Sequence, residues 1–382
     1  MRHTSFRIGL LVFVFLIFLS FPLFNNNLNY VKDFENLENR SMAAKPKLNT
    51  RAFDTYIEEY ERYYNDNFSI RFMLVKFFNW FNVDVLKKSP LPDRLVLGKN
   101  GWLFFGGYEA LTYRGIERLS ETDLKSIKTE LEYRQEYLKK RGCTFYIAIA
   151  PVKSNIYSDQ IQHNKYLRGQ QTWGEQVIHY LNAHSTVKPI NLFDRLRSQA
   201  RKDVLYFKLD DHWNQLGGFY AVNEILKCIS KDFPSVTTNK LDDYIIKKHF
   251  TDTGNLLEMI SNIKGMKDTV VQLQPKSGFK AKEVPLVNYP VIESFSDPDE
   301  YEKDREIAGS KQAKILIISD SFGLNTYPFL SEQFRRSVKI FDAWEYKLNE
   351  EIVEVEKPDI QLLILWEANI KSLLAHQSRP KH

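Results

Sequence analysis

Short apolar runs alternate with helical segments from residue 120 onward, and this alternation most narrows the folds that the chain can adopt. Ser120 and Asp123 form a capping box, and Gly142 ends the helix that follows them. The candidate strands are 144–150, 188–191, 204–208, 314–320, 338–341 and 360–365. Strands and helices in alternation imply a parallel sheet covered on both faces. We therefore expect an α/β fold.

Two polar motifs follow two of these strands. Asp210, Asp211 and His212 come after the strand at 204–208, and Ser321 comes after the strand at 314–320, where a helix is expected to begin. The carboxyl ends of parallel strands meet at one edge of the sheet, so a separation of 109 residues (321 − 212) is no obstacle. A serine hydroxyl becomes a nucleophile when a base accepts its proton and a carboxylate orients that base. Asp210 and His212 point to the same side of an extended chain, which favours Asp210 as the orienting carboxylate and leaves Asp211 to face solvent or cap the next helix.

Each motif also has a structural interpretation. Most serines at strand ends only cap helices, and His212 could pack against Trp213. However, Gly217 and Gly218 open the next helix and leave room for a close backbone approach. The combination of both motifs favours a Ser-His-Asp nucleophile.

Composition excludes several classes of function. The chain is 43% apolar and 26% charged, and its net charge of +5 has no concentrated Lys/Arg run behind it, so nucleic-acid binding is not indicated. His179 and His184 lack metal-ligand spacing and acidic neighbours, and Gly-rich phosphate loops are absent, so we predict no metal and no cofactor. Cys143 and Cys228 could form one disulfide, but their apolar settings favour two buried thiols.

The N-terminus carries a candidate membrane segment. An uncharged stretch of 17 residues, Ile8 to Phe24, follows a basic flank and would span roughly 25 Å as a helix. An uncleaved anchor is favoured over a cleaved signal peptide because the stretch is long for a signal. The basic flank places the N-terminus in the cytoplasm and the rest of the chain outside it, at the periplasmic face of the inner membrane in a Gram-negative cell.

The remaining organisation follows from local patterns. We expect a cytoplasmic tip and anchor at 1–30, a stalk at 31–50 and an extracytoplasmic catalytic domain at 51–382. Residues 237–310 lack the alternation and are predicted to be an irregular insertion, either a wall of a substrate cleft or a surface elaboration. Asn100 and Gly101 predict the turn of a hairpin.

A set of ordered landmarks resembles a known family. They are Glu38-Asn39-Arg40 with Pro46, Tyr64 to Phe68 with Arg71, Gly98 to Phe104, Ala150 to Lys153 with Tyr157, Lys208 to Trp213, and Ser321. Their order, with the Asp-x-His element before the serine, resembles the SGNH-hydrolase-like domain of the alginate O-acetyltransferase (AlgJ/AlgX) type.

The resemblance implies a three-layer SGNH-hydrolase-like fold in which Ser321 takes an acetyl group, His212 is the general base and acid, and Asp210 orients His212. It also implies O-acetylation of an exported polysaccharide, with a separate multi-pass membrane O-acyltransferase as the acetyl supplier. Two departures concern the local backbone and the oxyanion donors: Ser319 stands where the usual block has glycine, and no Gly-x-Asn-Asp block is present. Asn325 and Tyr327 are candidate oxyanion donors by proximity to Ser321.

Two rival functions remain open from the sequence. An esterase that removes acetyl groups would use the same acyl-enzyme, with water as the acceptor. A non-catalytic polysaccharide-binding assembly subunit could keep the fold. Trp102, Trp213 and Trp366 are candidates for stacking on sugar rings, although most aromatic residues are expected in the core.

Overall fold

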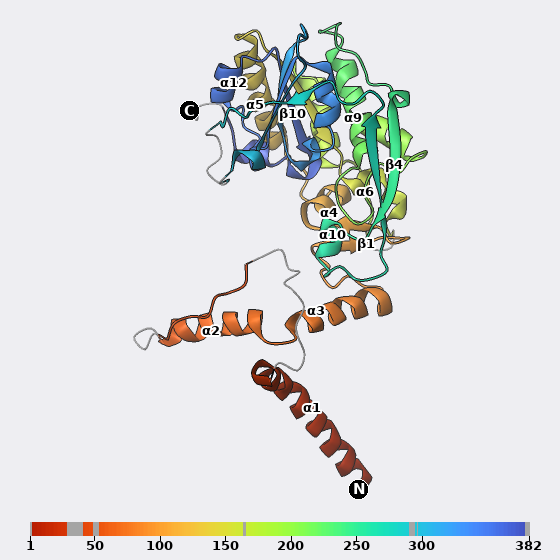
Figure 1. Cartoon of the computed structure of the whole chain (residues 1–382), viewed down its shortest axis with the longest axis vertical. Helices are drawn as coiled ribbons and strands as arrows, with labels where there is room; N and C mark the ends of the chain where they lie inside the picture. The colour runs from red at the N-terminus through yellow and green to blue at the C-terminus, as the bar shows by residue number, and fades with distance from the viewer. Residues whose placement is uncertain are drawn as a thin grey trace. The chain divides into compact units, whose positions relative to one another are not determined.

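The chain divides into two compact units. The computed structural model describes residues 2–28, 41–48, 53–162, 166–289, 295 and 297–378 (Figure 1). Unit 1 comprises Met1–Pro90 with Leu257–Gly265, and unit 2 comprises Leu91–Leu256 with Met266–His382. The predicted stalk at 31–50 and the landmark around Asn39 lie largely outside the described residues.

Unit 1 is helical. Its elements are α1 (Arg2–Leu28), α2 (Phe53–Asn67), α3 (Arg71–Trp80) and a π-helical turn η1 (Phe81–Val85). The apolar stretch predicted as an anchor lies in α1. Among the residues that the structure describes, no helix combines the length and the apolar character needed to cross a bilayer.

A six-stranded sheet forms the centre of unit 2, in the order β3-β10-β8-β9-β7-β6. Four strands are parallel, namely β3 (Thr144–Ala150), β10 (Ile360–Trp366), β8 (Lys314–Ser319) and β9 (Arg336–Ile340). The two at the edge, β7 (Glu302–Glu306) and β6 (Lys282–Glu283), are antiparallel. The expectation of a parallel sheet therefore holds for its centre and is wrong at this edge.

Helices cover both faces of the sheet, as Figure 1 shows. Alternate residues of each central strand face opposite clusters: Ile147 and Leu363 lie in one, Ala148 and Leu362 in the other. The first cluster is covered by α5 (Glu121–Lys139), α7 (Trp173–His184), α12 (Glu350–Glu356) and α13 (Ser372–Ala375). The second is covered by α8 (Phe193–Ala200), α9 (Gln215–Ile229) and α11 (Tyr327–Leu330). β3, β8 and β10 are buried on both sides, which explains their largely apolar sequences.

Two predicted strands are reduced to single bridges. Residues 188–191 contribute only the bridge Ala148↔Ile190, and residues 204–208 only the bridge Tyr206↔Trp213. The second bridge closes a loop on itself, because the Phe207 amide donates to the carbonyl of His212 (3.1 Å). Residues 204–208 therefore belong to a closed loop and not to the central sheet, although their composition is typical of a strand.

The stretch 237–310 has more regular structure than its sequence indicates. It forms an antiparallel pair, β4 (Tyr244–Thr251) with β5 (Asp268–Pro275), a short helix α10 (Asn255–Glu258), the 3-10 turn η4 (Pro298–Glu300), and the edge strands β6 and β7. Most side chains of β4 are exposed, so this strand lacks the period-two burial that marks a strand in a sequence.

The predicted hairpin forms from β1 (Leu95–Leu97) and β2 (Leu103–Phe105). Its turn places Asn100 and Gly101 at positive φ (53° and 77°), as an Asn-Gly turn requires. The Leu103 amide donates to the carbonyl of Lys208 (2.9 Å), so the hairpin supports the loop that carries His212. Trp102 is 5% exposed and belongs to the core.

Candidate active site

The structure brings Ser321, His212 and Asp210 together. His212 Nε2 lies 2.6 Å from Ser321 Oγ, and His212 Nδ1 lies 2.7 Å from Asp210 Oδ1. The side chains of His212 and Asp210 are 24% and 23% exposed, so a solute can reach them. This arrangement can pass the Ser321 proton to His212 while Asp210 holds the opposite ring nitrogen.

Asp210 is held in place by the backbone. Its Oδ1 also accepts from the His212 amide (2.9 Å), and its Oδ2 accepts from the Asn255 amide at the start of α10 (3.1 Å). These bonds fix the carboxylate plane relative to the imidazole. The i, i+2 spacing predicts the pairing with His212, whereas the contact with Asn255 links residues 45 positions apart.

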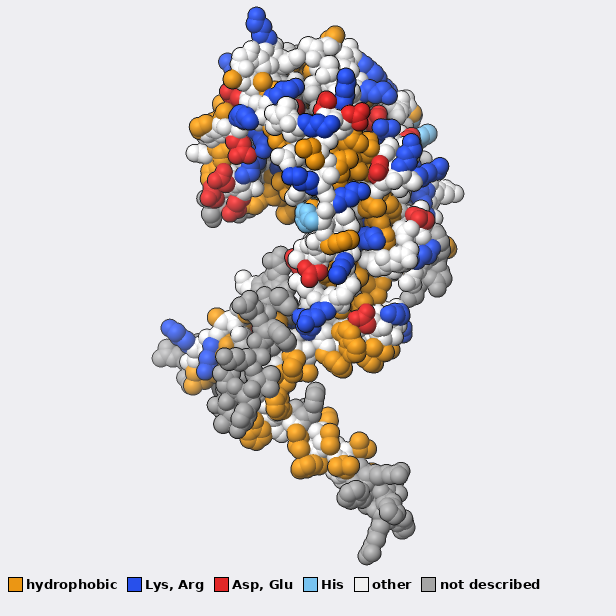
Figure 2. Space-filling model, turned by 45° about the vertical axis from the view of Figure 1, so that its right-hand side comes forward, with side chains coloured by type: hydrophobic (Ala, Val, Ile, Leu, Met, Phe, Trp, Pro, Cys, Tyr) orange, Lys and Arg blue, Asp and Glu red, His pale blue; other side chains and the backbone are white. Residues whose placement is uncertain are grey.

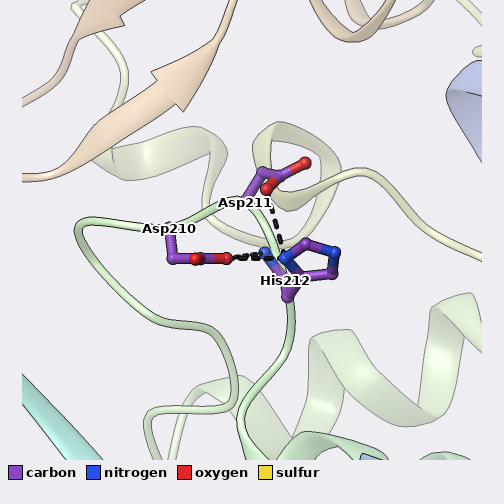
Figure 3. Close-up of side chains that lie close together, drawn as sticks. All are labelled: Asp210, Asp211 and His212. Carbon is purple, nitrogen blue, oxygen red and sulfur yellow. Dashed lines mark hydrogen bonds and ion pairs between the residues drawn. The ribbon is translucent and has the colours of Figure 1, made fainter. Parts of the chain in front are cut away.

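Asp211 does not face solvent or cap the next helix, contrary to the sequence prediction. It is 7% exposed, and its Oδ1 lies 3.3 Å from His212 Nδ1 (Figure 3). Asp211 also accepts a hydrogen bond from the Asn255 side chain. The cap of α9 is Asn214, whose side chain accepts from the amides of Leu216 and Gly217. His212 therefore has two carboxylates beside one ring nitrogen.

Both carboxylates affect the electrostatics of the site. Burial acts against the charged form of His212, yet the hydrogen bond to Asp210 and the charges of Asp211 and Asp210 raise its pKa to about 9. Burial would raise the pKa of Asp210, but the hydrogen bond and the charge of His212 lower it to about 2. The pair is thus an imidazolium and a carboxylate at neutral pH when no substrate is bound.

The Ser321 turn rests on Asp320, which the sequence analysis did not single out. Asp320 Oδ1 accepts from the Phe322 amide (2.9 Å), and its Oδ2 accepts from the Tyr346 hydroxyl (2.7 Å) and the Trp366 amide (2.6 Å). Asp320 is 1% exposed, and burial raises its pKa against these three bonds and the charge of His212. An aspartate at the end of a strand and just before a turn is a capping signal that could have been recognised.

A buried lysine holds the His212 loop through hydrogen bonds to its backbone. Lys153 begins α6 (Lys153–Ile156), is completely buried, and donates to the carbonyls of Phe207 (3.1 Å), Lys208 (3.3 Å) and Asp210 (2.7 Å). Three backbone carbonyls of one loop therefore converge on a single ammonium group. The sequence indicates Lys153 only as a landmark of the resemblance.

Glu109 of α4 (Gly107–Arg114) provides the counter-charge. It is completely buried, and its Oε1 accepts from the Ser154 amide (2.8 Å). Burial raises the pKa of Glu109 against the attraction of Lys153, and burial lowers the pKa of Lys153 against the attraction of Glu109 and Asp211. Both residues are buried next to the His212 loop, and no pattern in the sequence predicts that they lie near each other.

Two glycines let α9 approach both loops. A Cβ on Gly218 would lie 2.3 Å from the carbonyl oxygen of Asn325, and one on Gly217 would lie 2.3 Å from the carbonyl oxygen of Leu205. Both contacts are with backbone, which cannot move aside as a side chain can. The prediction that Gly217 and Gly218 permit a close approach is confirmed.

Gly323 packs equally tightly beneath the nucleophile. A Cβ at this position would lie 2.0 Å from Ser319 Oγ and 2.9 Å from Lys339 Cε. We expect Gly323→Ala to displace the turn and lower the rate at which Ser321 reacts with an activated ester about 10- to 100-fold, because small misplacements of reacting groups are costly. Adding Ser319→Gly should recover most of the loss, and Ser319→Gly alone is the control. An equally inactive double variant would contradict this steric explanation, and steady-state kinetics would show it.

The other predicted ligand-binding side chains have structural partners. Asn325 Nδ2 donates to the carbonyl of Trp213 (2.8 Å), and the buried Tyr327 hydroxyl contacts the carbonyls of Lys303 and Ser337 (both 2.8 Å). Trp213 is 0% exposed and donates to the carbonyl of Phe322 (3.0 Å). The Tyr327 hydroxyl and the Trp213 indole N–H therefore point to backbone carbonyls, and Asn325 commits one of its two amide hydrogens in the same way. Trp213 is too buried to stack on a sugar.

A cation could be considered at Asp210, Asp211 and His212, whose ligand atoms lie within 4.8 Å of one another (Figure 3). However, both ring nitrogens of His212 are already engaged, Nδ1 with Asp210 and Nε2 with Ser321. A metal would have to break one of these contacts. The geometry therefore fits proton transfer better than metal ligation.

Comparisons with known proteins identify the family to which this domain belongs. A family model described as the SGNH hydrolase-like domain of acetyltransferase AlgX matches residues 95–342, well over half of the chain. The chain belongs to this family. The resemblance and the SGNH-hydrolase-like α/β fold predicted from the sequence are thereby confirmed.

Individual relatives are distant. The probable alginate O-acetylase AlgJ of Pseudomonas syringae pv. tomato is 22% identical over 174 residues, which are 46% of this chain and 42% of that protein. The chain thus matches less than half of that relative's length. Bacillus cereus PatB1 (TM-score 0.52, 17% identity) is covered over 95% of its length by 71% of this chain. A DHHW family protein from Eubacterium siraeum (TM-score 0.52, 16% identity) is covered over 100% by 75% of this chain. These two likenesses concern the fold.

Proposed function

We propose that this member of the AlgX-type family transfers acetyl groups to hydroxyls of an exported polysaccharide through an acetyl-Ser321 intermediate. The observation that carries the proposal is the continuous contact from Ser321 Oγ through His212 to Asp210. Membership of the family indicates that the transferred group is acetyl. An acetyltransferase that works through a covalent intermediate needs a nucleophile that first accepts and then releases the acetyl group.

Two half-reactions follow from this geometry. In the first, Ser321 Oγ attacks the acetyl carbonyl carbon, its proton passes to His212 Nε2, and the donor leaves with that proton. In the second, a sugar hydroxyl loses its proton to His212, attacks the acetyl carbon, and Ser321 regains the proton as the ester bond breaks. Asp210 stabilises the imidazolium in both. An oxyanion forms in each half-reaction, so one donor set serves both.

An acetyl adduct on Ser321 tests the proposal directly. After exposure to an activated acetyl ester, intact-protein and peptide mass spectrometry should place one acetyl group on Ser321. The adduct should be absent from Ser321→Ala and His212→Gln, while Ser277→Ala, at an exposed serine, should acetylate normally. A wild-type chain that stays unmodified at Ser321 would refute the acyl-enzyme.

Transfer and hydrolysis differ in the acceptor. With an acetyl ester and an oligosaccharide, a transferase produces acetylated sugar at the expense of free acetate, whereas an esterase releases acetate at an unchanged rate. If Ser321→Ala cells still acetylate the polymer and cells that lack the protein do not, the chain is an assembly subunit. The family membership favours transfer over these two alternatives.

The surroundings of the reaction are also proposals. A multi-pass membrane O-acyltransferase would supply the acetyl group, and the catalytic unit would lie outside the cytoplasm, where an exported polysaccharide is found. Protease added to intact spheroplasts should digest unit 2. Complete protection until the cells are lysed would place the protein inside instead.

The pKa of His212 predicts the pH dependence. Only the neutral imidazole accepts the Ser321 proton, and a pKa of about 9 leaves most rings protonated at neutral pH. We therefore expect the rate of Ser321 acetylation under kcat/KM conditions to rise about tenfold per pH unit below pH 9 and to level off above it. Stopped-flow acetylation at several pH values measures this limb, and a plateau that begins near pH 6.5 would contradict the raised pKa.

A further inference from the structure

Unit 1 carries an exposed apolar face. Over α3, η1 and the residue that follows η1, six large apolar side chains are between 39% and 59% exposed. We call them the α3–η1 face: Phe77, Phe78, Trp80, Phe81, Val85 and Leu86. In Figure 2 exposed hydrophobic side chains gather beside Lys and Arg in the N-terminal part of the chain. A contiguous exposed patch of this kind marks an interaction surface more often than isolated apolar residues do.

The face lies on the outer side of the helix. Phe77, Phe81 and Val85 are spaced i, i+4 and i+8 and so share one side. Asn79 and Val83 lie on the other side and are buried, and Asn79 Nδ2 donates to Ser261 Oγ (3.1 Å). The segment Leu257–Gly265 of the same unit thus occupies the inner side, and the outer side faces away from these internal contacts.

The charges around the face are mainly positive. Residues 71–90 contain four basic residues (Arg71, Lys76, Lys87, Lys88) and one acidic residue (Asp84), a net charge of +3 (4 − 1). A cavity of about 360 Å³ at one end is lined by Met73, Lys76, Phe77, Trp80, Ile263 and Lys264, which again combines apolar surface with two lysines. Acidic macromolecular surfaces are the complementary partner.

We propose that the α3–η1 face lies in the interface of an anionic lipid bilayer. Phenylalanine, tryptophan and aliphatic side chains would enter the boundary between headgroups and acyl chains, and Lys87 and Lys88 would reach the anionic headgroups. A protein groove would also accept the aromatic side chains, but the surplus of lysines beside them favours a negatively charged surface. The proposal concerns residues 77–88 and is independent of the predicted anchor and of the acetyl-transfer proposal.

The test measures fluorescence from a label on the face itself, because α1 could also bind lipid and binding of the whole chain would not distinguish the two. In the full chain with Cys143→Ala and Cys228→Ala, Phe81→Cys carries an environment-sensitive NBD fluorophore, and Phe78→Cys is a second labelling site. Val355→Cys, at an exposed position of unit 2, is the matched control. Vesicles contain phosphatidylcholine with or without phosphatidylglycerol, and brominated acyl chains serve as the quencher.

We expect the fluorescence at position 81 to shift to shorter wavelength and to be quenched on vesicles with phosphatidylglycerol, and the fluorescence at position 355 to remain unchanged. High salt, or Lys87→Gln with Lys88→Gln, should reduce the quenching. The proposal is overturned if vesicle-bound chain shows no quenching at 81 and 78, or if the chain stays off anionic vesicles. It is also overturned if the shift occurs without lipid together with a doubled mass in light scattering, because the face would then join two copies.

Discussion

Asp210→Asn is expected to reduce the rate of Ser321 acetylation by ~10³- to 10⁴-fold, as loss of the orienting carboxylate does in other Ser-His-Asp sites. Asp210 Oδ1 accepts from both Nδ1 and the amide of His212, so an asparagine would present a donor or an altered acceptor to the ring. The imidazole would then lose the tautomer that keeps Nε2 free to accept the Ser321 proton. Single-turnover acetylation with an activated acetyl ester measures this loss.

Asp211→Asn provides the matched comparison, because Asp211 Oδ1 is also near Nδ1 but at 3.3 Å. We expect a rate loss of about tenfold or less. The pKa of His212, measured by NMR titration of the ring, should fall below 9 in this variant because one of the charges that raise it is gone. If the two variants lose equal activity, or if Asp211→Asn is the more severe, the assignment of the orienting role to Asp210 is wrong.

Lys153→Met is expected to lower the free energy of unfolding by about 3 to 5 kcal/mol, because it leaves buried polar groups without their donor and a buried carboxyl without the nearby positive charge. The substitution leaves the carbonyls of Phe207, Lys208 and Asp210 without their shared donor, and it leaves Glu109 without its counter-charge. Because these carbonyls belong to the His212 loop, acetylation of Ser321 should fall with stability. Urea unfolding followed by circular dichroism measures the change, and Lys139→Met, at an exposed lysine, should change little.

The pH dependence separates the two effects of this substitution. Without Lys153, the pKa of Glu109 should rise further, so the folded chain would hold a proton that the unfolded chain releases above about pH 4.5. Stability of Lys153→Met should therefore fall as pH rises from 4.5 through the raised pKa. Glu109→Gln in the same chain should remove this slope and restore part of the stability. An unchanged slope in the double variant would show that Glu109 is not the titrating group.

The local patterns of the sequence predict much of the site. Asp210 and His212 are two residues apart, Ser321 follows an apolar run, and both motifs lie where a chain leaves a strand-like segment. These relations join residues that are close in the chain, so they can be recognised from the sequence alone. The strand assigned to 204–208 is nevertheless wrong, because Tyr206 bridges Trp213 in its own loop and does not join the sheet.

Long-range contacts explain what the sequence could not predict. Asn255 bonds both aspartates of the motif from 44 and 45 positions away, and Lys153 reaches the same loop from more than 50 positions away. Asp211 is buried because these distant neighbours cover it. The sequence near Asp211 does not reveal them, so it predicted a side chain that faces solvent. The antiparallel edge of the sheet could not be predicted for the same reason. β7 pairs with β9, and no hydrophobic periodicity in the sequence indicates that pairing.

The sequence by itself predicted the α/β class, the contact among Ser321, His212 and Asp210, and the close approach at Gly217 and Gly218, because spacing and residue type are local properties of the chain. Only the tertiary structure decided that Asp211 also faces His212, that Asp320 and Lys153 hold the two loops, and that Asn325 and Tyr327 are occupied by backbone partners. Hydrogen bonds and burial join residues that folding, and not sequence order, makes neighbours.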